Sequence, residues 1–370
     1  MKVITVVGTR PEIIRLSEII KKLDNTFNHI LVHTNQNFDD ELKTIFFNQL
    51  KLKKPKYDLK IKENTAIKTI SKILIKIEEV ILKEKPDAFF VLGDTNSALS
   101  ALVAKKYKIP IFHYEAGNRC YDQRVPEEIN RKIVDHISDI NLTYSNFAKD
   151  NLIQEGLNKN NIIKIGSPLR EVINTNLNEI LSNKILKKLK LEKEKYFLFS
   201  FHREENVDDE NQLKNFVNVI NKLAKKNKEK IVLTLHPRTK KNLKIHKFKM
   251  DKKIIINKPF GYFEYINLQL NAKVTLSDSG SIPEEASILG LKAICLRDTH
   301  ERQESSSEPS VVMSELDYNQ LNTAIKTLVK FKKNSKIISD YAEENISQKI
   351  PKIIISYTSI INKKVWKKNI

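Results

Sequence analysis

The sequence predicts an α/β protein made of two Rossmann-like, doubly wound domains. Short apolar runs alternate with longer amphipathic stretches, as in repeated strand–helix units built around a parallel sheet. The alternation pauses near residues 165–168 and then restarts, so two such sheets are expected. We therefore predict an N-terminal domain over 1–168 and a C-terminal domain over 169–350. A final helical segment over 351–370 is expected to pack back across the domains.

Five segments in the first half favour strands. The run 88–92 is continuously apolar, which is typical of a parallel strand buried on both faces. Pro11 opens an amphipathic helix whose residues Ile13, Leu16, Ile20 and Leu23 share one face. The expected strands are 3–7, 30–33, 88–92, 109–113 and 140–144, with further helices through 42–46, 66–83, 97–106 and 127–137.

The second half repeats the pattern after a Lys- and Asn-rich helical stretch that runs to about residue 191. Its last three amphipathic stretches have no strand after them, so they are expected to be terminal helices. The expected strands are 197–201, 231–235, 254–256, 274–276 and 293–296, and the terminal helices are 317–331, 335–346 and 351–364.

The composition excludes several classes of protein. Of the 370 residues, 40% are hydrophobic and 30% charged, which is ordinary for a globular chain and unlike a disordered one. Cys120 and Cys295 are too few for a disulfide framework, and nothing spaces them for zinc, so no metal is expected. The apolar run before Gly8 is too short for a signal peptide or a membrane span. We expect a soluble, cytoplasmic protein that does not contact a membrane.

The formal charge of +20 comes from 65 Lys and Arg residues against 45 Asp and Glu residues. The lysines are scattered over every predicted helix, whereas a nucleic-acid site would cluster them. Excess Lys, Ile and Asn with only 8 glycines indicates a general bias in composition. We therefore expect no nucleic-acid partner. Salt-sensitive binding of nucleic acid would indicate the alternative, a nucleic-acid-binding protein.

Functional side chains are expected where the parallel strands end, because doubly wound sheets bind ligands at that edge. Gly8-Thr9-Arg10-Pro11-Glu12 follows the first strand, and Arg15 lies one turn into the helix. Two guanidiniums beside the free amides of a helix start suit an oxyanion such as phosphate. The alternative is an ordinary turn with surface arginines. No dinucleotide or Walker fingerprint is present.

Three carboxylates follow neighbouring strands of the first half. Asp94 comes after the run 88–92, Glu115 follows the next strand, and Glu127 lies in the helix start after it. Carboxylates that converge in one place suggest acid–base chemistry, because like charges and burial separate their pKa values. The alternative is that Asp94 and Glu127 only cap helices.

The second half offers a matching set of polar strand ends. His202 and Arg203 follow its first strand, and His236 follows its second. The segment 277–285 supplies hydroxyls and backbone amides suited to a diphosphate. The segment 297–302 ends the next strand and contains Arg302.

Together these motifs closely resemble the non-hydrolysing UDP-N-acetylglucosamine 2-epimerase family. The resemblance runs from residue 1 to about 305 and is nearest to the branch that inverts C2 of UDP-2-acetamido-2,6-dideoxy-L-talose. That branch makes UDP-N-acetyl-L-fucosamine for bacterial surface polysaccharides such as capsule or O-antigen. The motifs, in order, are GTRPE at 8–12, GDT at 93–95, EAG at 115–117, PEExNR at 126–131, HRxEN at 202–206, DSGxxxEE at 278–285 and RDTxER at 297–302.

The resemblance implies a GT-B-type fold with a UDP-linked 2-acetamido sugar in the cleft between the domains, no added cofactor, and a homodimer. It implies acid–base roles for Asp94, Glu115 and Glu127 and an active-site role for His202. The implied substrate-binding residues are Arg10 at the phosphate, Ser279, Gly280 and Ser281 in the diphosphate loop, Glu285 at the ribose, Tyr265 near uracil, Arg302 at the substrate, and also Arg15, Arg131, Arg203 and His236.

Three departures from the family pattern bear on the substrate. Arg15 stands where the UDP-GlcNAc enzymes usually have Lys. The planar, forked guanidinium of Arg does not bind a ligand in the same way as the compact ammonium of Lys. The loop between Glu115 and Glu127 is shorter and carries Asn118 and the segment 119–124 instead of Leu-Arg-Thr. Gln303 replaces the usual Pro.

The implied chemistry explains the need for these groups. The C2 proton of a 2-acetamido sugar is hardly acidic, so direct removal would leave an unstabilised carbanion. If UDP leaves C1 as the proton is lost, a glycal forms, and UDP adds back after protonation on the other face. Carboxylates would move the proton, cations and helix amides would stabilise the departing diphosphate, and closure would retain the intermediate.

Three other readings share parts of this pattern. A UDP-GlcNAc/UDP-ManNAc 2-epimerase would use the same chemistry on a different sugar. A GT-B glycosyltransferase would share the fold and the nucleotide-sugar site but would need an acceptor. A hydrolysing epimerase would release free N-acetylmannosamine and accumulate UDP.

Overall fold

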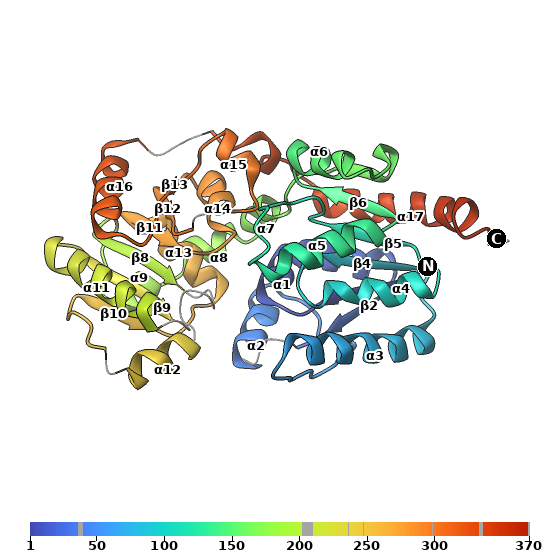
Figure 1. Cartoon of the computed structure of the whole chain (residues 1–370), viewed down its shortest axis with the longest axis horizontal. Helices are drawn as coiled ribbons and strands as arrows, with labels where there is room; N and C mark the ends of the chain where they lie inside the picture. Colours follow the sequence, from blue (N-terminus) through green and yellow to red (C-terminus); the bar gives the residue numbers. More distant parts are fainter. Residues whose placement is uncertain are drawn as a thin grey trace. The chain divides into compact units, whose positions relative to one another are not determined.

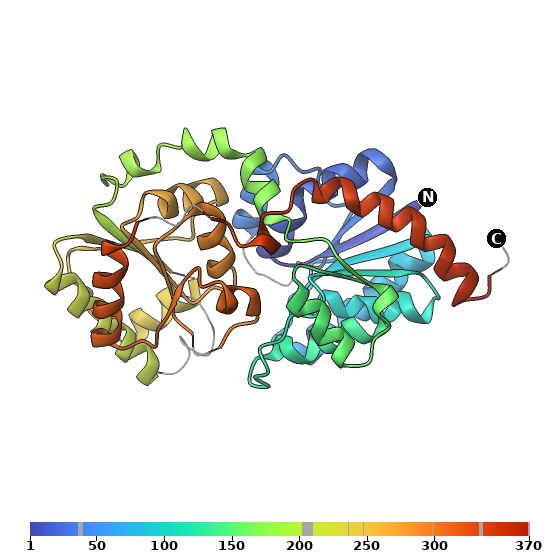
Figure 2. The same cartoon turned by 90° about the horizontal axis from the view of Figure 1, so that it is seen from above.

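The computed structural model describes residues 1–35, 40–201, 210–235, 237–246, 248–297, 299–332 and 336–368. The chain divides into two compact units, each built on a parallel sheet (Figures 1 and 2). The first unit comprises 1–175 and 339–370, and the second comprises 176–338. The fold class of two Rossmann-like α/β domains is therefore confirmed.

The division of the chain differs from the predicted boundaries at 168 and 350. Helix α7 (Leu169–Thr175) contacts α1 (Arg10–Thr26) and so belongs to the first unit. Helix α17 (Ile346–Lys364) also packs against α1, within the first unit, where we had expected it to pack across the domains. The chain therefore returns to its first unit at Ser339, because α1 offers the apolar surface that α17 covers.

The first unit contains a seven-stranded parallel sheet in the order β3-β2-β1-β4-β5-β6-β7. Strand β4 is buried along its whole length, as its continuous apolar run predicts. The fourth predicted strand begins two residues late, after Pro110, which has no amide hydrogen to donate to a neighbouring strand. The strands are β1 (Lys2–Val7), β2 (Asn28–His33), β3 (Tyr57–Asp58), β4 (Ala88–Leu92), β5 (Ile111–Tyr114), β6 (Ile140–Thr143) and β7 (Ile162–Lys164).

Helices cover both faces of this sheet. Three neighbouring helices, α3, α4 and α5, form one layer, while α1 and α17 lie on the opposite face (Figures 1 and 2). The predicted face of α1 is confirmed, since Ile13, Leu16, Ile20 and Leu23 are all buried. The remaining helices are α2 (Asp40–Gln49), α3 (Ala66–Glu84), η1 (Ala98–Ser100), α4 (Ala101–Lys106), α5 (Pro126–Ile137), α6 (Asn146–Gln154), η2 (Lys159–Asn161) and η3 (Ser339–Tyr341).

The second unit contains a six-stranded parallel sheet in the order β10-β9-β8-β11-β12-β13. Its strands are β8 (Tyr196–Phe201), β9 (Lys230–Leu235), β10 (Ile254–Asn257), β11 (Val274–Ser277), β12 (Ala293–Cys295) and β13 (Val312–Met313). Its helices are α8 (Leu177–Leu181), α9 (Ile185–Lys188), α11 (Glu210–Lys226), α12 (Pro237–Ile245), α13 (Tyr262–Asn271), α14 (Ile282–Leu289), α15 (Gln303–Ser307) and α16 (Tyr318–Lys330).

Two features of the described chain differ from or extend the sequence analysis. Of the predicted helix 335–346, the described residues 336–345 contain only the short turn η3, and Asn345, with a left-handed φ of 56°, separates this turn from α17. In the described ranges, no helix is long and apolar enough to cross a membrane.

Gly117 is the glycine whose hydrogen side chain the fold most clearly requires. It follows β5 with φ of +80°, and a Cβ there would lie only 2.1 Å from the carbonyl oxygen of Ala148. Two penalties therefore combine at this position, namely a left-handed backbone and a clash with the backbone at α6.

We expect Gly117→Ala to lower the free energy of unfolding by more than about 3 kcal/mol. Gly156→Ala is the matched control, because Gly156 has φ of +88° with nothing within 4 Å of the added Cβ. The control should lose only the backbone term of about 1–2 kcal/mol. Urea denaturation of both variants measures the difference, and equal losses would contradict the proposed clash.

Candidate active site

The loops after β1, β4, β5 and β6 lie at one edge of the first sheet. Strand β4 pairs in parallel with β1 on one side and β5 on the other, and β5 pairs with β6. Their carboxyl ends therefore meet at the same edge, and the loop segments 8–12, 93–97 and 115–119 become neighbours. The predicted residues Arg10, Asp94 and Glu115 lie on these loops, and each is partly buried.

Asp94 is held by a guanidinium. Its Oδ2 lies 2.7 Å from Nη2 of Arg131 and accepts a hydrogen bond of 2.9 Å from Nε. Arg131 is buried on α5, and its Nη1 donates to Oε2 of Glu128 at 3.0 Å. The side chain of Asp94 keeps 25% of its surface exposed. This carboxylate is therefore fixed in direction but still accessible to a ligand.

Glu115 lies at the centre of a second set of contacts. Its backbone is left-handed, with φ of 68°, and its Oε2 accepts a hydrogen bond of 3.3 Å from the hydroxyl of Tyr144. Nδ2 of Asn118 donates to its other oxygen at 3.4 Å. The guanidinium of Arg15 lies over the ring of Tyr144, with Nη1 3.5 Å from the hydroxyl. Tyr144 thus links two predicted site residues, Arg15 and Glu115.

Tyr144 is not among the residues that the motifs predict, although its position in the sequence carries a signal. The residue directly follows β6, at the same sheet edge as the other candidates, and the expected strand 140–144 had included it. It is fully buried. Its ring packs edge-on against Tyr114 at a centroid distance of 5.1 Å.

Glu127 and Glu128 have different surroundings. Glu127 is partly exposed in the first turn of α5, and within the described ranges it has no hydrogen-bond or ion-pair partner. Glu128 is 1% exposed and accepts hydrogen bonds from the amides of Cys120 and Tyr121 as well as from Arg131. The structure therefore connects Glu128, and not the predicted Glu127, to the network that holds Asp94.

A buried ionic network supports the loops that carry Asp94 and Glu115. Asp135 of α5 accepts hydrogen bonds from the amide of Gly117 and, at 2.8 Å, from Arg119. Nδ1 of His113 lies 2.9 Å from Asp135, and Nε2 lies 2.8 Å from the carbonyl oxygen of Gly93. Arg119 also makes two hydrogen bonds to Glu155. The segment 119–124 therefore contributes Arg119 to the protein interior.

Glu12, in the GTRPE segment, is a further buried carboxylate at this edge. It is 2% exposed and accepts hydrogen bonds from the backbone amides of Gly8 and Thr9. Burial raises its pKa from 4.5 to about 7, and the hydrogen bonds act in the opposite direction.

The second unit carries the predicted diphosphate loop at the start of α14. The hydroxyls of Ser279 and Ser281 lie 3.0 Å apart, and Ser281 donates to Oε1 of Glu285 at 2.8 Å. The other oxygen of Glu285 accepts a hydrogen bond of 2.6 Å from Nε2 of Gln269. The hydroxyl of Tyr265 is also in this region, and burial together with the charge of Glu285 raises its pKa.

Close packing surrounds Gly280 in this loop. A Cβ on Gly280 would lie 2.3 Å from Oε1 of Glu301, whose other oxygen is 3.1 Å from Arg297. Arg302 is buried, and its Nη2 lies 3.6 Å from Oε2 of Glu284. The structure thus groups Ser279, Gly280, Ser281, Glu285, Tyr265 and Arg302 in the second unit. The predicted residues His202, Arg203 and His236 lie outside the described residues.

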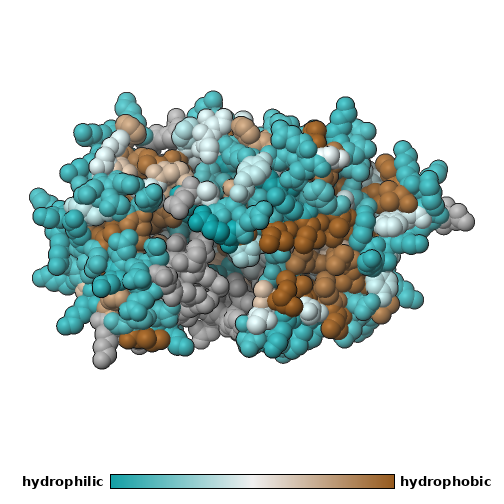
Figure 3. All heavy atoms as spheres, viewed as in Figure 1, coloured by the Kyte–Doolittle hydropathy of each residue, from teal (hydrophilic) through white to brown (hydrophobic). Residues whose placement is uncertain are grey.

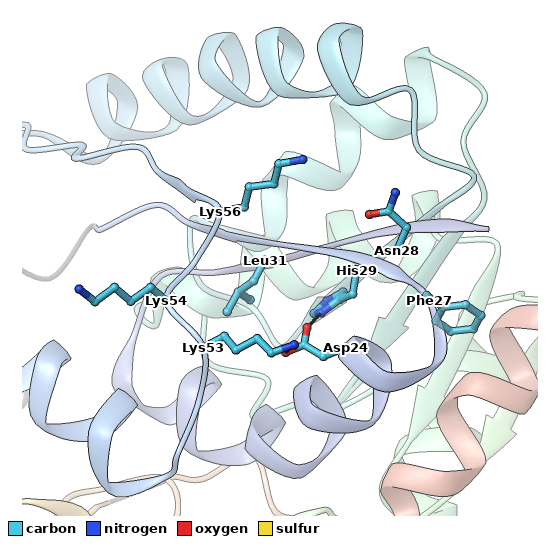
Figure 4. A pocket seen from close by; sticks show the side chains of 8 residues that line it. All are labelled: Asp24, Phe27, Asn28, His29, Leu31, Lys53, Lys54 and Lys56. Atoms are coloured by element: carbon cyan, nitrogen blue, oxygen red, sulfur yellow. Dashed lines mark hydrogen bonds and ion pairs between the residues drawn. The ribbon is translucent and has the colours of Figure 1, made fainter.

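A pocket of about 240 Å³ occupies another part of the first unit (Figure 4). It lies where β2 begins and before β3, opposite the edge that carries the carboxylates. His29 and Asp24 point toward each other in it, with Nδ1 2.6 Å from Oδ1. Nε2 of His29 lies 2.8 Å from the hydroxyl of Thr5, so both ring nitrogens have internal partners. Across the described ranges, no group of three or more His, Cys, Asp or Glu residues is placed to hold a metal ion.

We expect Asp135→Asn to lower the free energy of unfolding by about 3–5 kcal/mol, because it removes the fully buried charge that pairs with Arg119 and leaves the partly exposed Glu155 as the carboxylate on this buried guanidinium. Glu155→Gln is the control, since Glu155 pairs with the same arginine but is 26% exposed, and it should cost about 1 kcal/mol. Chemical denaturation at neutral pH measures both. A loss for Asp135→Asn no larger than that of the control would contradict the role given to Asp135.

Comparisons with known proteins agree with this geometry. Residues 21–355 match the family model described as UDP-N-acetylglucosamine 2-epimerase. The chain is 41% identical to the UDP-N-acetylglucosamine 2-epimerase of Methanocaldococcus jannaschii over 91% of this chain and 94% of the relative. It is 36% identical to a UDP-2,3-diacetamido-2,3-dideoxy-D-glucuronate 2-epimerase of Pseudomonas aeruginosa, over 81% of this chain and 84% of the relative.

Solved structures show the same relationship. A UDP-N-acetylglucosamine 2-epimerase from Rickettsia bellii is 44% identical, with a TM-score of 0.92 and 100% of both chains covered. The M. jannaschii enzyme in complex with UDP-GlcNAc and UDP is 39% identical, with a TM-score of 0.90 over 96% of this chain and 100% of that one. With its two Rossmann-like units of the GT-B type, the chain belongs to the UDP-N-acetylglucosamine 2-epimerase family of isomerases.

Proposed function

We propose that this protein inverts C2 of a UDP-linked 2-acetamido sugar without hydrolysing it. The observation that carries the proposal is the placement of two carboxylates, Asp94 and Glu115, at neighbouring strand ends beside buried guanidiniums. Membership of the epimerase family supports the reaction class. The relatives from M. jannaschii and P. aeruginosa are both named as 2-epimerases of UDP sugars.

The proposed reaction breaks the C2–H bond and the bond from C1 to the UDP oxygen, which gives a glycal and UDP. Asp94 and Glu115 move the proton. The family resemblance makes Glu127 a further acid–base candidate and His202 a further active-site residue. Proton return to the other face of C2 and re-addition of UDP at C1 complete the inversion, so no hydrogen or electron is lost overall.

The departing diphosphate carries negative charge that must be stabilised. Arg10 and Arg15 at the start of α1 provide cations for it in the first unit. The hydroxyls and amides of the segment 279–281 at the start of α14 provide donors in the second unit. We propose that these groups bind the phosphates of a UDP sugar, with Glu285 of the second unit at the ribose and Tyr265 near the base.

Two substrates remain candidates within this reaction class. Similarity to the M. jannaschii enzyme, whose solved complex contains UDP-GlcNAc, favours UDP-GlcNAc as the substrate of this protein. UDP-2-acetamido-2,6-dideoxy-L-talose is favoured by the short loop after Glu115. In the structure this loop touches the site, since Asn118 donates to Glu115. A difference in the loop can therefore reach the reacting sugar.

We expect deuterium from solvent to enter C2 during turnover in D2O, which NMR of the product detects with each of the two sugar nucleotides. Asp94→Asn and Glu115→Gln should each lower kcat by about 10²–10⁴-fold, because each removes a proton-transfer group. Glu192→Gln, an exposed partner of Lys195, is the control and should leave kcat unchanged.

Product that carries no label at C2 would exclude elimination. Accumulation of UDP with a free sugar would indicate a hydrolysing epimerase, and sugar transfer to an added acceptor would indicate a glycosyltransferase.

We propose further that the protein is a homodimer formed through the outer surface of α3, α4 and α5. This apolar face is visible as a brown patch in Figure 3, where Figure 1 shows α4 and α5. Glu78 and Glu79 on α3 and Lys106 and Lys132 on α4 and α5 add charges of both signs, which suits a self-complementary contact. The large exposed apolar residues of the face are Ile67, Ile75, Leu82, Leu102, Tyr107, Ile129 and Ile133.

We expect light scattering coupled to size-exclusion chromatography to give the mass of a dimer for the wild type. Ile75→Glu should shift it to a monomer, because Ile75 is 58% exposed in the middle of the face and a buried charge would be unpaired there. Ile355→Glu is the control, since Ile355 is 54% exposed on α17 of the opposite layer. A dimer that survives Ile75→Glu, or is lost equally with Ile355→Glu, would contradict this interface.

A further inference from the structure

The carboxylate of Glu12 joins two loops of the candidate site. Its Oε2 accepts hydrogen bonds from the amide of Gly8 at 2.9 Å and from the amide and hydroxyl of Thr9, both at 2.7 Å. Its Oε1 accepts a hydrogen bond of 3.0 Å from the hydroxyl of Thr95, which lies 83 residues away in sequence. Glu12 is therefore bound both to the turn after β1 and to the loop after β4.

A capping role explains only part of this arrangement. The reciprocal contact between Thr9 and Glu12 is a capping box, which stabilises the start of α1. The contact with Thr95 adds nothing to the helix start, because Thr95 belongs to another strand–helix connection. The hydroxyl of Thr95 also accepts a hydrogen bond from the amide of Ser97, whose own hydroxyl lies 2.7 Å from that of Thr34 after β2. A continuous set of hydrogen bonds thus runs across three strand ends.

We propose that Glu12 is a positioning residue that fixes Arg10 relative to Asp94. Arg10 is two residues before Glu12, and Asp94 directly precedes Thr95, so the contact between Glu12 and Thr95 links the proposed phosphate-binding cation to the proposed proton-transfer carboxylate. The inference rests on the proposed function. The separation of Arg10 and Asp94 matters for the reaction, because the sugar C2 must reach Asp94 while Arg10 holds the diphosphate.

The charge of Glu12 controls the strength of this link. An ionised carboxylate accepts all four donors, whereas a protonated one must use an oxygen to donate, which reverses the contact with Thr95. Burial raises the pKa of Glu12 to about 7. The hydrogen bonds from Thr9, Gly8 and Thr95 act in the opposite direction and lower the pKa. Apart from Glu12 itself, the charged and titratable groups in the first two turns of α1, at the end of β2 and in the loop after β4 are Arg10, Arg15, His33 and Asp94, and none of them is among the causes of the shift.

The pH dependence of kcat/KM tests this inference in the full-length protein. For the wild type, we expect kcat/KM to rise through about pH 7 as Glu12 ionises. Glu12→Gln keeps the shape and neutral hydrogen bonds of the protonated residue, so its kcat/KM should lack this rise and stay about tenfold below the wild-type plateau. Glu18→Gln, one and a half turns along α1 and paired with Lys21, is the control and should follow the wild-type profile.

A second variant separates positioning from helix capping. Thr95→Val removes the link between the loops but leaves the contacts of Glu12 with Gly8 and Thr9. It should lower kcat/KM by about tenfold, and the double variant with Glu12→Gln should be no worse than either single variant. Independent, multiplying losses would overturn the inference. So would a wild-type rise that persists unchanged in Glu12→Gln.

Two further readouts do not require turnover. The raised pKa means that the folded state binds the proton more tightly than the unfolded state. Wild-type stability should therefore fall as pH rises from about 4.5 to about 7, and Glu12→Gln should lack this decline. The affinity for UDP, measured by calorimetry, should be lower for Glu12→Gln than for Glu18→Gln above pH 7. If the wild type fails to epimerise any UDP sugar, the proposed function fails, and equal UDP affinities of the two variants would then overturn the role of Glu12 separately.

Discussion

The fully buried carboxylate of Asp135 is the interaction on which the geometry of the first unit's site depends. It accepts hydrogen bonds from the amide of Gly117 and the guanidinium of Arg119, both in the loop after β5. It also lies 2.9 Å from Nδ1 of His113 in β5, whose other nitrogen contacts the carbonyl of Gly93 after β4. One side chain of α5 therefore fixes the loop after β5 directly and the loop after β4 through His113. A buried charge is stable only when it is fully paired, and this requirement makes the loop positions specific.

The candidate carboxylates are held in contrasting ways above this network. Asp94 is bound by the guanidinium of Arg131, whereas Glu115 receives longer hydrogen bonds from the neutral groups of Tyr144 and Asn118. Two carboxylates with different hydrogen-bond partners suit a reaction in which protons leave one face and return to the other.

The basic charge of the chain has little part in this chemistry. Its many lysines are spread over the helices, and the surface formed by α3, α4 and α5 carries large exposed apolar side chains as well as charges of both signs. Arginine is rare in the sequence, and Arg15, Arg119, Arg131 and Arg302 are buried against carboxylates or aromatic rings. Forked donors persist at these positions because a flexible ammonium cannot reproduce two fixed hydrogen bonds.

The sequence alone determined the fold class and predicted the location of the candidate site, because strand–helix alternation and the residues that end each strand are local properties. The edge strands β3 and β7 were missed because two or three residues carry no detectable periodicity. Only the tertiary structure decided that Glu128, and not Glu127, joins Arg131, that Arg119 is structural, and that Tyr144 and Glu12 connect the loops. These are contacts between segments far apart in the chain, and burial, which decides their chemistry, exists only once the sheet has formed.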